Sequence, residues 1–449
     1  MADDSKKVAR AHLVDAGVEE LPYDWDVVTL GDLFTGDRGI AVGVMYPGDH
    51  DPEGVPLIKA GDLNGSIINP QPDFRISNDK HHEYRRTALE GGELLMTLVG
   101  NVGQCAVVPP RMAGWNTARA VAVMRLSDSS DTHFVQQCLL SRPLQHLMDV
   151  WSNTTVQATL NLKEIRQLPL PWPPKKSRDA IASILGALDD KIELNRRMNA
   201  TLEGMARALF QSWFVDFDPV RAKLDGRKPE GLDKATAALF PDAFEESSLG
   251  PVPKGWLVSR LDEIASVMMG LSPDGESYNS NGIGRPLING PVEFGDYFPV
   301  RTKWTEAATR FAAEGDLIFC VRGSTTGRRV VSDGEYGIGR GVCAIRAIGG
   351  YHSFIYQTIN IGLDRLLEKT TGSVFPSLSA PDIKGFSVLN PSKSIIEAYE
   401  RMTKPLIQRI QQNHHQSRTL ATLRDTLLPK LLSGELSVGH STITKGDKL

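Results

Sequence analysis

The same arrangement of residues occurs twice along this chain of 449 residues. This internal repeat limits the possible folds more than any other feature, because each half must then form the same kind of unit. The matches are Pro22-x-x-Trp25 with Pro253-x-x-Trp256, Val55-Pro56-Leu57-Ile58 with Arg285-Pro286-Leu287-Ile288, Gly92-Glu93-Leu94-Leu95 with Gly315-Asp316-Leu317-Ile318, Gly100 with Gly323, Arg119 and Arg125 with Arg340 and Arg346, and Val156, Leu160 and Ile165 with Val374, Leu378 and Ile383. The offset shrinks from 231 to 218, as small loop deletions produce.

Each half begins with short apolar runs separated by Gly, Pro, Asn and Asp. The runs 94–99 and 120–124, with their counterparts 317–321 and 341–345, are typical of buried strands. Residues 134–151 and 353–367 have the pattern of helices. We therefore expect an α+β globule in each half.

A long amphipathic helix follows each globule. Its apolar seam alternates steps of four and three residues, which is typical of a coiled coil. The first seam is Ile181, Leu185, Leu188, Ile192, Asn195, Asn199, Leu202, Ala206, Leu209 and Trp213. Adding 218 gives a weaker copy, Tyr399, Thr403, Leu406, Ile410, Asn413, Ser417, Leu420, Arg424, Leu427 and Leu431.

Both seams become polar at the same two steps, Asn195/Asn199 and Asn413/Ser417. If a pseudo-two-fold axis relates the repeats, the helices run antiparallel and these residues meet. Pairing them would fix the register of the helices at some cost in stability. The alternative is that they lie on the solvated side.

These features predict six segments of the chain. They are a first globule at 1–174, a central long helix at 175–215, a linker at 216–250, a second globule at 251–392, a distal long helix at 393–436 and a tail at 437–449. The linker is polar, with a short helical patch at 234–239.

Composition narrows the functional classes only slightly. The net charge of −4 gives no support to a nucleic-acid reader, although residues 301–346 carry eight Lys/Arg against five Asp/Glu. The four cysteines are scattered, and the adjacent pairs His81-His82 and His414-His415 lack ligand spacing, so we expect free thiols and no metal site. No apolar run is long enough for a membrane span, and the first residues lack a secretory signal, so we expect a cytoplasmic chain.

The order globule, long helix, globule, long helix resembles the specificity subunit of type I restriction-modification enzymes. The resemblance covers nearly the whole chain. Besides the Pro-x-x-Trp and Gly-Asp/Glu-Leu repeats, it rests on Leu160-Asn161-Leu162, the stretch from Leu188 to Phe214, and the linker residues Phe214–Pro219 and Leu239–Pro241. The second repeat departs from the pattern at Ser377-Leu378-Ser379 and at Arg424.

The resemblance implies two tandem, pseudo-symmetric α+β target-recognition domains separated by two long antiparallel coiled-coil helices. In that family each domain reads one half of a bipartite site in double-stranded DNA. The helices set the spacer and dock two modification subunits, which a restriction subunit joins. The resemblance implies no cofactor for this chain; S-adenosylmethionine, ATP and Mg are implied for its partners.

Motifs for an intrinsic activity are missing from the sequence. An adenine methyltransferase needs an Asn/Asp-Pro-Pro-aromatic motif for the flipped base, and ATP chemistry needs a Walker A loop. Gly337–Gly341 is better explained as a hairpin loop, and Asp216 and Asp218 as a solvated turn. We expect no catalytic residue. Two alternatives stay open: a recognition part of a methyltransferase or nuclease with its own activity, and a coiled-coil scaffold without DNA affinity.

The candidate DNA contacts lie mainly in the loop after each central strand. Arginine can read guanine, amides suit adenine, and hydroxyls can serve phosphates or bases. The loop candidates are Asn101 and Gln104 in the first half and Arg322, Ser324, Thr325, Arg328 and Arg329 in the second. Further candidates for phosphate contacts are Arg75, Lys80, Arg85, Arg86, Arg301 and Lys303. Each is alternatively an ordinary exposed side chain.

Overall fold

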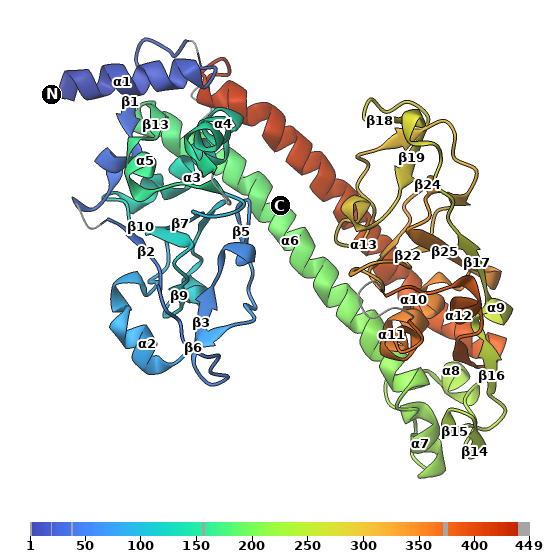
Figure 1. Ribbon diagram of the computed structural model, residues 1–449. Coiled ribbons are helices and arrows are strands. Elements are labelled where there is room, and N and C mark those ends of the chain that lie inside the picture. The colour runs from blue at the N-terminus through green and yellow to red at the C-terminus, as the bar shows by residue number, and fades with distance from the viewer. Residues whose placement is uncertain (1, 19, 37–38, 155–157, 371–375, 439–449) are drawn as a thin grey trace, which may run out of the picture. The chain divides into compact units, whose positions relative to one another are not determined.

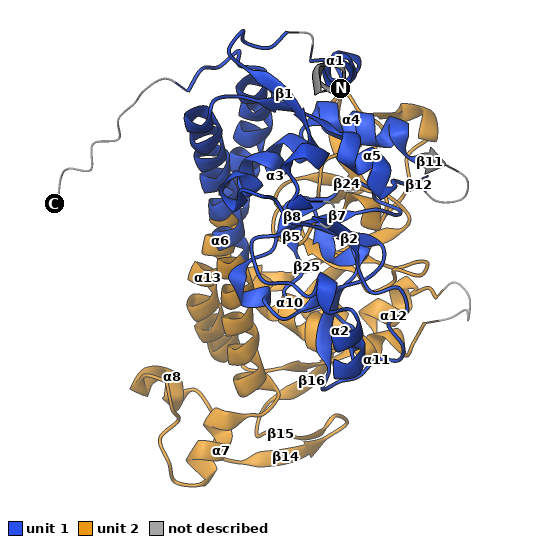
Figure 2. Cartoon of the chain, turned by 90° about the vertical axis from the view of Figure 1, so that its left-hand side faces the viewer, with its two compact units in different colours: residues 1–196, 414–449 blue, residues 197–413 orange. Residues whose placement is uncertain are grey.

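The computed structural model describes residues 2–18, 20–36, 39–154, 158–370 and 376–438. Two compact units divide the chain: residues 1–196 with 414–449, and residues 197–413 (Figures 1 and 2). The predicted match of Val156 with Val374 and nearly all of the predicted tail, 437–449, lie outside the described residues.

The first unit is built around an antiparallel four-stranded sheet. Its strand order is β2 (Ile40–Val42), β10 (Val121–Met124), β7 (Leu94–Thr97), β8 (Cys105–Val107). Leu94 and Met96 pack into the same core as Phe134 of helix α3 (Thr132–Leu140), whereas Leu95 packs into a second core. Because alternate residues of a strand face opposite sides, the apolar residues Leu94–Met96 of β7 fill cores on both faces.

Smaller elements complete the first unit. Strand β3 (Val55–Ile58) pairs antiparallel with β6 (Arg75–Ile76) and parallel with β9 (Asn116–Thr117), and β1 (Asp26–Thr29) pairs with β13 (Pro169–Trp172). The other helices and strands are α1 (Ala2–Asp15), β4 (Leu63–Asn64), β5 (Ile67–Ile68), α2 (Asn78–Glu83), α4 (Arg142–Trp151), β11 (Asn153–Thr154), β12 (Ala158–Thr159) and α5 (Leu162–Gln167). The predicted helix at 134–151 is thus interrupted at Ser141, where Pro143 restarts a helix in its first turn.

The second unit repeats the main strand pairings of the first. Its four-stranded sheet has the order β17 (Ala265–Met269), β25 (Val342–Ala347), β22 (Leu317–Cys320), β23 (Arg329–Val331). A parallel pair, β19 (Arg285–Ile288) with β24 (Tyr336–Ile338), and an antiparallel pair, β16 (Leu257–Arg260) with β26 (Ser387–Asn390), match those of the first unit. The other elements are α9 (Leu261–Ile264), β18 (Tyr278–Asn279), β20 (Trp304–Thr305), β21 (Phe311–Ala312), α10 (His352–Ile361), α11 (Leu363–Leu367) and α12 (Ala380–Lys384). The internal repeat and the α+β class are confirmed.

The two long helices are α6 (Lys175–Phe214) and α13 (Lys393–Leu432), of 40 residues each (Figure 1). In the first unit, Ile181 and Leu185 near the start of α6 share a core with Leu428 and Leu431 near the end of α13. In the second unit, the Tyr399 hydroxyl near the start of α13 donates to the Ala206 carbonyl of α6 at 3.1 Å. Both units therefore contain the helices antiparallel, as predicted. In the described part of the chain no helix is long and apolar enough to cross a membrane.

The segment 216–250 is more ordered than a polar linker would be. Besides the expected short helix, α8 (Lys234–Ala238), it forms α7 (Asp218–Leu224) and a hairpin of β14 (Phe244–Ser247) with β15 (Gly250–Pro253). Phe217 packs on the rings of Phe244 and Trp256, at centroid distances of 5.8 and 5.9 Å. Aromatic residues thus anchor the segment to the second unit.

Candidate nucleic-acid interface

The loop after the central strand, β7 in the first half and β22 in the second, has the same backbone hydrogen-bonding pattern in both halves. In the first half the Gly103 amide donates to the Thr97 carbonyl at 3.0 Å, and in the second the Gly327 amide donates to the Cys320 carbonyl at 3.0 Å. Gly100 and Gly323 both have left-handed backbones, with φ of 81° and 84°, which glycine adopts without strain. The second loop is one residue longer, so equal frames carry loops of different length and chemistry.

In the first-half loop the two amide candidates have different surroundings. The Gln104 side chain accepts from the Gly65 amide at 2.7 Å and donates to the Asn101 side chain at 3.4 Å. Gln104 thereby ties the loop to the turn between β4 and β5. Asn101 is exposed, so it is the more accessible of the two for a ligand.

In the second-half loop the candidates separate into a structural and an exposed group. The Arg329 guanidinium donates to Asn360 of α10 and to the Gly327 carbonyl, and burial lowers its pKa below the usual value. Thr325 is half-buried. Arg322, Ser324 and Arg328 remain exposed.

The remaining basic candidates differ in how far the fold occupies them. Arg75 donates to the Gly54 carbonyl at 2.7 Å, and Lys303 contacts Glu293 at 3.4 Å. Arg301 donates to the Tyr336 hydroxyl at 3.1 Å. Lys80 forms an ion pair with Glu83 at 2.7 Å. These four side chains are committed at least in part to contacts within the fold.

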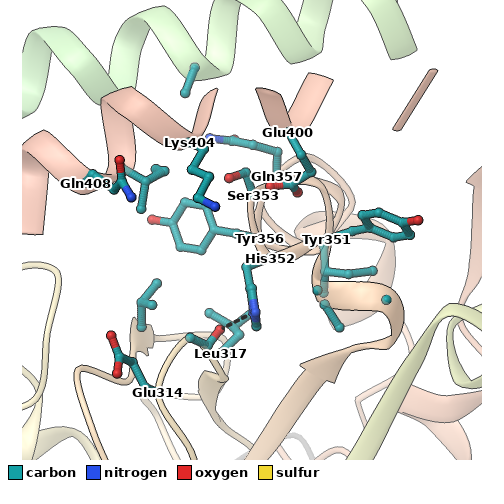
Figure 3. A pocket seen from close by; sticks show the side chains of 18 of the residues that line it. Glu314, Leu317, Tyr351, His352, Ser353, Tyr356, Gln357, Glu400, Lys404 and Gln408 are labelled. Carbon is teal, nitrogen blue, oxygen red and sulfur yellow. Dashed lines mark hydrogen bonds between the residues drawn. The ribbon is translucent and has the colours of Figure 1, made fainter. Parts of the chain in front are cut away.

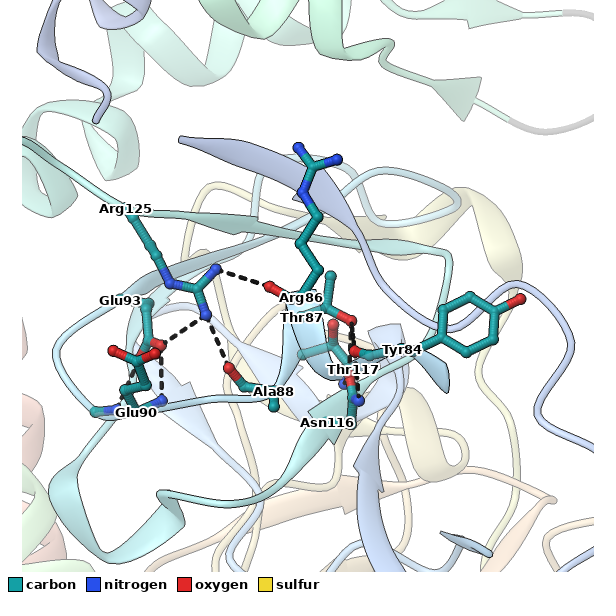
Figure 4. Close-up of polar contacts among 10 residues, drawn as sticks. Tyr84, Arg86, Thr87, Ala88, Glu90, Glu93, Asn116, Thr117 and Arg125 are labelled. Carbon is teal, nitrogen blue, oxygen red and sulfur yellow. Dashed lines mark hydrogen bonds and ion pairs between the residues drawn. The ribbon is translucent and has the colours of Figure 1, made fainter. Parts of the chain in front are cut away.

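Arg85 and Arg86 are exposed neighbours in the short turn after α2. The Arg86 guanidinium extends away from the polar cluster beneath it (Figure 4). The Arg86 carbonyl accepts a hydrogen bond from the Arg125 guanidinium at 3.1 Å. The backbone of Arg86 is therefore fixed while its side chain stays at the surface.

Matching arginines of the two halves hold a buried carboxylate at the start of the central strand. Arg125 contacts Glu93 at 3.2 Å (Figure 4), and Arg346 contacts Asp316 at 2.7 Å. The acid side chains are only 4% and 1% exposed. Glu93 also accepts from the amides of Glu90 and Gly91, so this repeated pair closes the loop before the strand.

The polar seam residues of the long helices are hydrogen-bonded in pairs. In the first unit, Asn195 donates to Ser417 at 3.2 Å and to Gln416 at 3.0 Å. In the second, Asn413 donates to Asn199 at 2.8 Å, and both are buried. Gln416 lies one step away from the seam, so the heptad pattern did not identify it.

A cavity of about 800 Å³ lies in the second unit beside α10 and α13 (Figure 3). Lys404 and Tyr356 extend into it (Figure 3). Gln357 on its wall is 4% exposed, and its side-chain oxygen has no hydrogen-bond partner among the described residues. Burial raises the pKa of the Glu400 carboxyl, which accepts from the Phe354 amide at 2.8 Å.

The first unit explains why this cavity exists. There Gln137, which matches Gln357, donates to Asp189 at 2.8 Å, and Asp189 accepts from Arg424 at 2.7 Å. With the 218-residue offset of the helix seams, Ile407 occupies the position equivalent to Asp189, and Ala206 the position equivalent to Arg424. Ile407 and Ala206 both line the cavity. The second unit thus has hydrocarbon side chains where the first has an ion pair.

Within the described ranges no group of three His, Cys, Asp or Glu side chains is arranged to hold a metal ion. All four cysteines are buried, and burial raises the pKa of the thiols of Cys105, Cys138 and Cys343. Because the thiolate is the reactive form, these three thiols are poor nucleophiles at neutral pH.

Comparison with known proteins places these features in a family context. Residues 22–204 match the family model described as type I restriction modification DNA specificity domain. The MjaIX specificity subunit of Methanocaldococcus jannaschii is 23% identical, over 94% of this chain and 96% of its own length. The HindI specificity subunit of Haemophilus influenzae is 26% identical, over 64% and 72% respectively. In fold, the chain is similar to the type I restriction-modification S subunit from M. genitalium, with a TM-score of 0.54 and 14% identity over 92% of this chain and 96% of that one.

Proposed function

We propose that this chain, which is related over nearly its whole length to specificity subunits of type I restriction enzymes, reads a bipartite site in double-stranded DNA, one half-site for each unit. It carries no catalytic residue of its own in this proposal. Methylation and cleavage belong to partner subunits.

A single observation carries the bipartite proposal. The loops of the two halves share the same backbone turn but carry different side chains. Gly100 and Gly323 set the same backbone turn, yet amides follow in the first half and arginines in the second. Amides pair well with adenine, and arginine pairs well with guanine. Two readers built on one scaffold need this combination of constant frame and variable surface.

The acidic net charge does not weigh against DNA binding, because charge is distributed unevenly. The whole chain carries −4, but Arg322 and Arg328 are exposed in one loop, and Arg85 and Arg86 in one turn. Local clusters of this kind can neutralise phosphates even on a chain of negative net charge.

The long helices are assigned two roles in this proposal. They set the spacer between the half-sites, and they dock two modification subunits that bind S-adenosylmethionine. The hydrogen bonds of Asn195 and Asn199 across the seam support the first role, since polar pairs in an apolar seam fix register. Removing one heptad from each helix should then change the spacer or abolish binding, while each half-site stays the same.

The assembled complex would act in the cytoplasm. Restriction subunits that use ATP and Mg would join the modification subunits there. This chain contributes sequence recognition alone.

The decisive experiment maps methylated adenines in cells with and without this chain. Loss of one bipartite methylated motif on deletion, and its return on complementation, are expected. An unchanged methylome would show that the chain does not direct an active modification enzyme.

Two other functions make different predictions. If the chain carried its own activity, the purified chain would transfer methyl groups or cut DNA without partners. If it were a scaffold without DNA affinity, it would not retard duplex DNA selectively even with modification subunits present. We expect neither result.

A further inference from the structure

Arg119 and Arg340 occupy the same turn in the two halves. Each turn joins the parallel strand to the sheet strand that pairs with the central one, β9 to β10 in the first half and β24 to β25 in the second. The Arg119 amide donates to the Val44 carbonyl at 2.9 Å, and the Arg340 amide donates to the Ser272 hydroxyl at 3.0 Å. The backbone of each arginine is therefore fixed by its main-chain amide.

A glycine directly after the neighbouring strand packs closely against the backbone that precedes each arginine. A Cβ at Gly43 would lie 2.1 Å from the Thr117 carbonyl oxygen, and one at Gly270 would lie 2.2 Å from the Gly339 carbonyl oxygen. Such distances are far inside van der Waals contact, so any other residue would push the turn away. The close approach holds both arginines in a defined place.

Neither arginine side chain is used by the fold. Both are exposed, and within the described residues neither guanidinium forms a hydrogen bond or an ion pair. The other matched arginines, Arg125 and Arg346, are bound to buried carboxylates. Of the two arginines that the repeats share, one therefore stabilises the sheet and the other faces solvent.

Both turns lie at the end of the sheet from which the candidate loops emerge. The Leu98 amide donates to the Ala120 carbonyl at 2.8 Å, and the Val321 amide donates to the Gly341 carbonyl at 3.0 Å. The pairing of β22 with β25 ends at Cys320 and Val342, so the turn that carries Arg340 and the loop that begins at Arg322 lie at the same end of the sheet. In each half the exposed arginine thus borders the variable loop.

We propose that Arg119 and Arg340 each bind a phosphate of the DNA backbone, one in each half-site. This inference rests on the proposed function. What two half-sites share is the sugar-phosphate backbone, and what distinguishes them is base sequence. The arginines common to both halves bind the common part, and the loops 100–104 and 322–329, which differ, face the bases. Arginine suits the task because its planar fork donates two parallel hydrogen bonds to phosphate oxygens.

The test uses the chain assembled with its modification subunits and a duplex carrying the methylated motif found in cells. Arg119→Ala and Arg340→Ala are each titrated over a range of salt concentrations. Each variant should bind about tenfold more weakly, as loss of one charged hydrogen-bond contact gives. The slope of log affinity against log salt should fall by about one for each arginine removed.

Three comparisons make the result specific. Substituting single base pairs in either half-site should lower the affinity of each variant by the same factor as it lowers that of the wild type. Phosphate contacts carry no sequence information. Arg119→Lys and Arg340→Lys should keep the salt slope. Arg111→Ala, an exposed residue at the opposite end of the first sheet, should change nothing.

Each other outcome counts against the proposal. If the wild-type complex ignores the motif, the proposed function fails and the phosphate contacts fail with it. If the wild type binds selectively but the alanine variants keep their affinity and salt slope, only the phosphate contacts are overturned. If a variant loses discrimination at particular base pairs, that arginine reads bases instead.

Discussion

Arg346 binds the Asp316 carboxylate side-on. Its Nε and Nη2 atoms donate hydrogen bonds to the two carboxylate oxygens at 2.9 and 2.7 Å. Asp316 is only 1% exposed, although the arginine is 46% exposed. The arrangement repeats at Arg125 and Glu93, so it belongs to the scaffold common to both units.

Removing this arginine should destabilise the second unit. Arg346→Met leaves a buried carboxylate without its main donor, which costs about 1–3 kcal/mol. Urea unfolding should show the lower midpoint, and Arg340→Ala, in the neighbouring exposed turn, should stay within about 0.5 kcal/mol of the wild type. A midpoint for Arg346→Met equal to that of Arg340→Ala would contradict a stabilising ion pair.

Arg322→Ala should alter recognition of one half-site only. The side chain is exposed beside the second-half loop, and its only described strand partner is a backbone bridge to Ser377. Methylome mapping with this variant should show a relaxed second half-site and an unchanged first one. Equal loss at both half-sites would count against independent reading by the two units.

Matched glutamines on equivalent helices should respond in opposite ways to the same substitution. Gln137→Leu removes the donor to Asp189 and should cost about 1–3 kcal/mol. Gln357→Leu removes a buried oxygen without a partner in the described part of the chain, so it should be neutral or stabilising. Chemical unfolding of both variants decides the matter, and equal losses would show that Gln357 is satisfied in solution.

The buried seam pair Asn199 and Asn413 should behave as a coupled unit. Asn413→Leu removes the 2.8 Å donor to Asn199 and should cost about 1–3 kcal/mol, as should Asn199→Leu. The double variant should regain much of that loss, because two leucines pack in an apolar seam. A double-mutant cycle measures the coupling, and strict additivity of the two losses would argue against a direct interaction.

Glu400 should make stability depend on pH. Burial raises the pKa of its carboxyl above the value of about 4.3 in an unfolded chain. The neutral form is therefore favoured by folding, and the contribution is fully present below the unfolded pKa and lost as pH rises through the folded one.

Glu400→Gln should remove this loss, so the variant should gain stability relative to the wild type between pH 4 and pH 7. Urea midpoints at both values measure the difference. Glu397→Gln, an exposed change on the same helix, is the control. An unchanged pH profile for Glu400→Gln would show that another group dominates.

The repeat, the α+β class and the antiparallel helices were predictable because they depend on the spacing of apolar and repeated residues, which is visible in the sequence. Buried strands such as 121–124 are continuous apolar runs, and the seam from Ile181 to Trp213 repeats in alternating steps of four and three residues. Helix α7 and the hairpin β14–β15 were missed, because their order depends on ring contacts such as Phe217 with Trp256, which connect distant residues.

The candidate site was predictable as loops but not as individual contacts. The sequence identifies the arginines but does not show which of them form hydrogen bonds within the fold. Arg329 binds Asn360 and Arg75 binds the Gly54 carbonyl, whereas Arg322 and Arg86 remain exposed. Likewise, only the structure reveals that Gly43 and Gly270 each pack against the backbone that precedes one of the two turns.

The packing of α1 has a consequence for how the protein is made. Ala9 and Leu13 of α1 share one core with Leu428, Leu431 and Leu432 at the end of α13. The first unit is therefore discontinuous in sequence, while residues 197–413 form the second without interruption. On a translating ribosome the second unit has all of its residues first. The first must wait, with part of its core uncovered, until the end of α13 emerges.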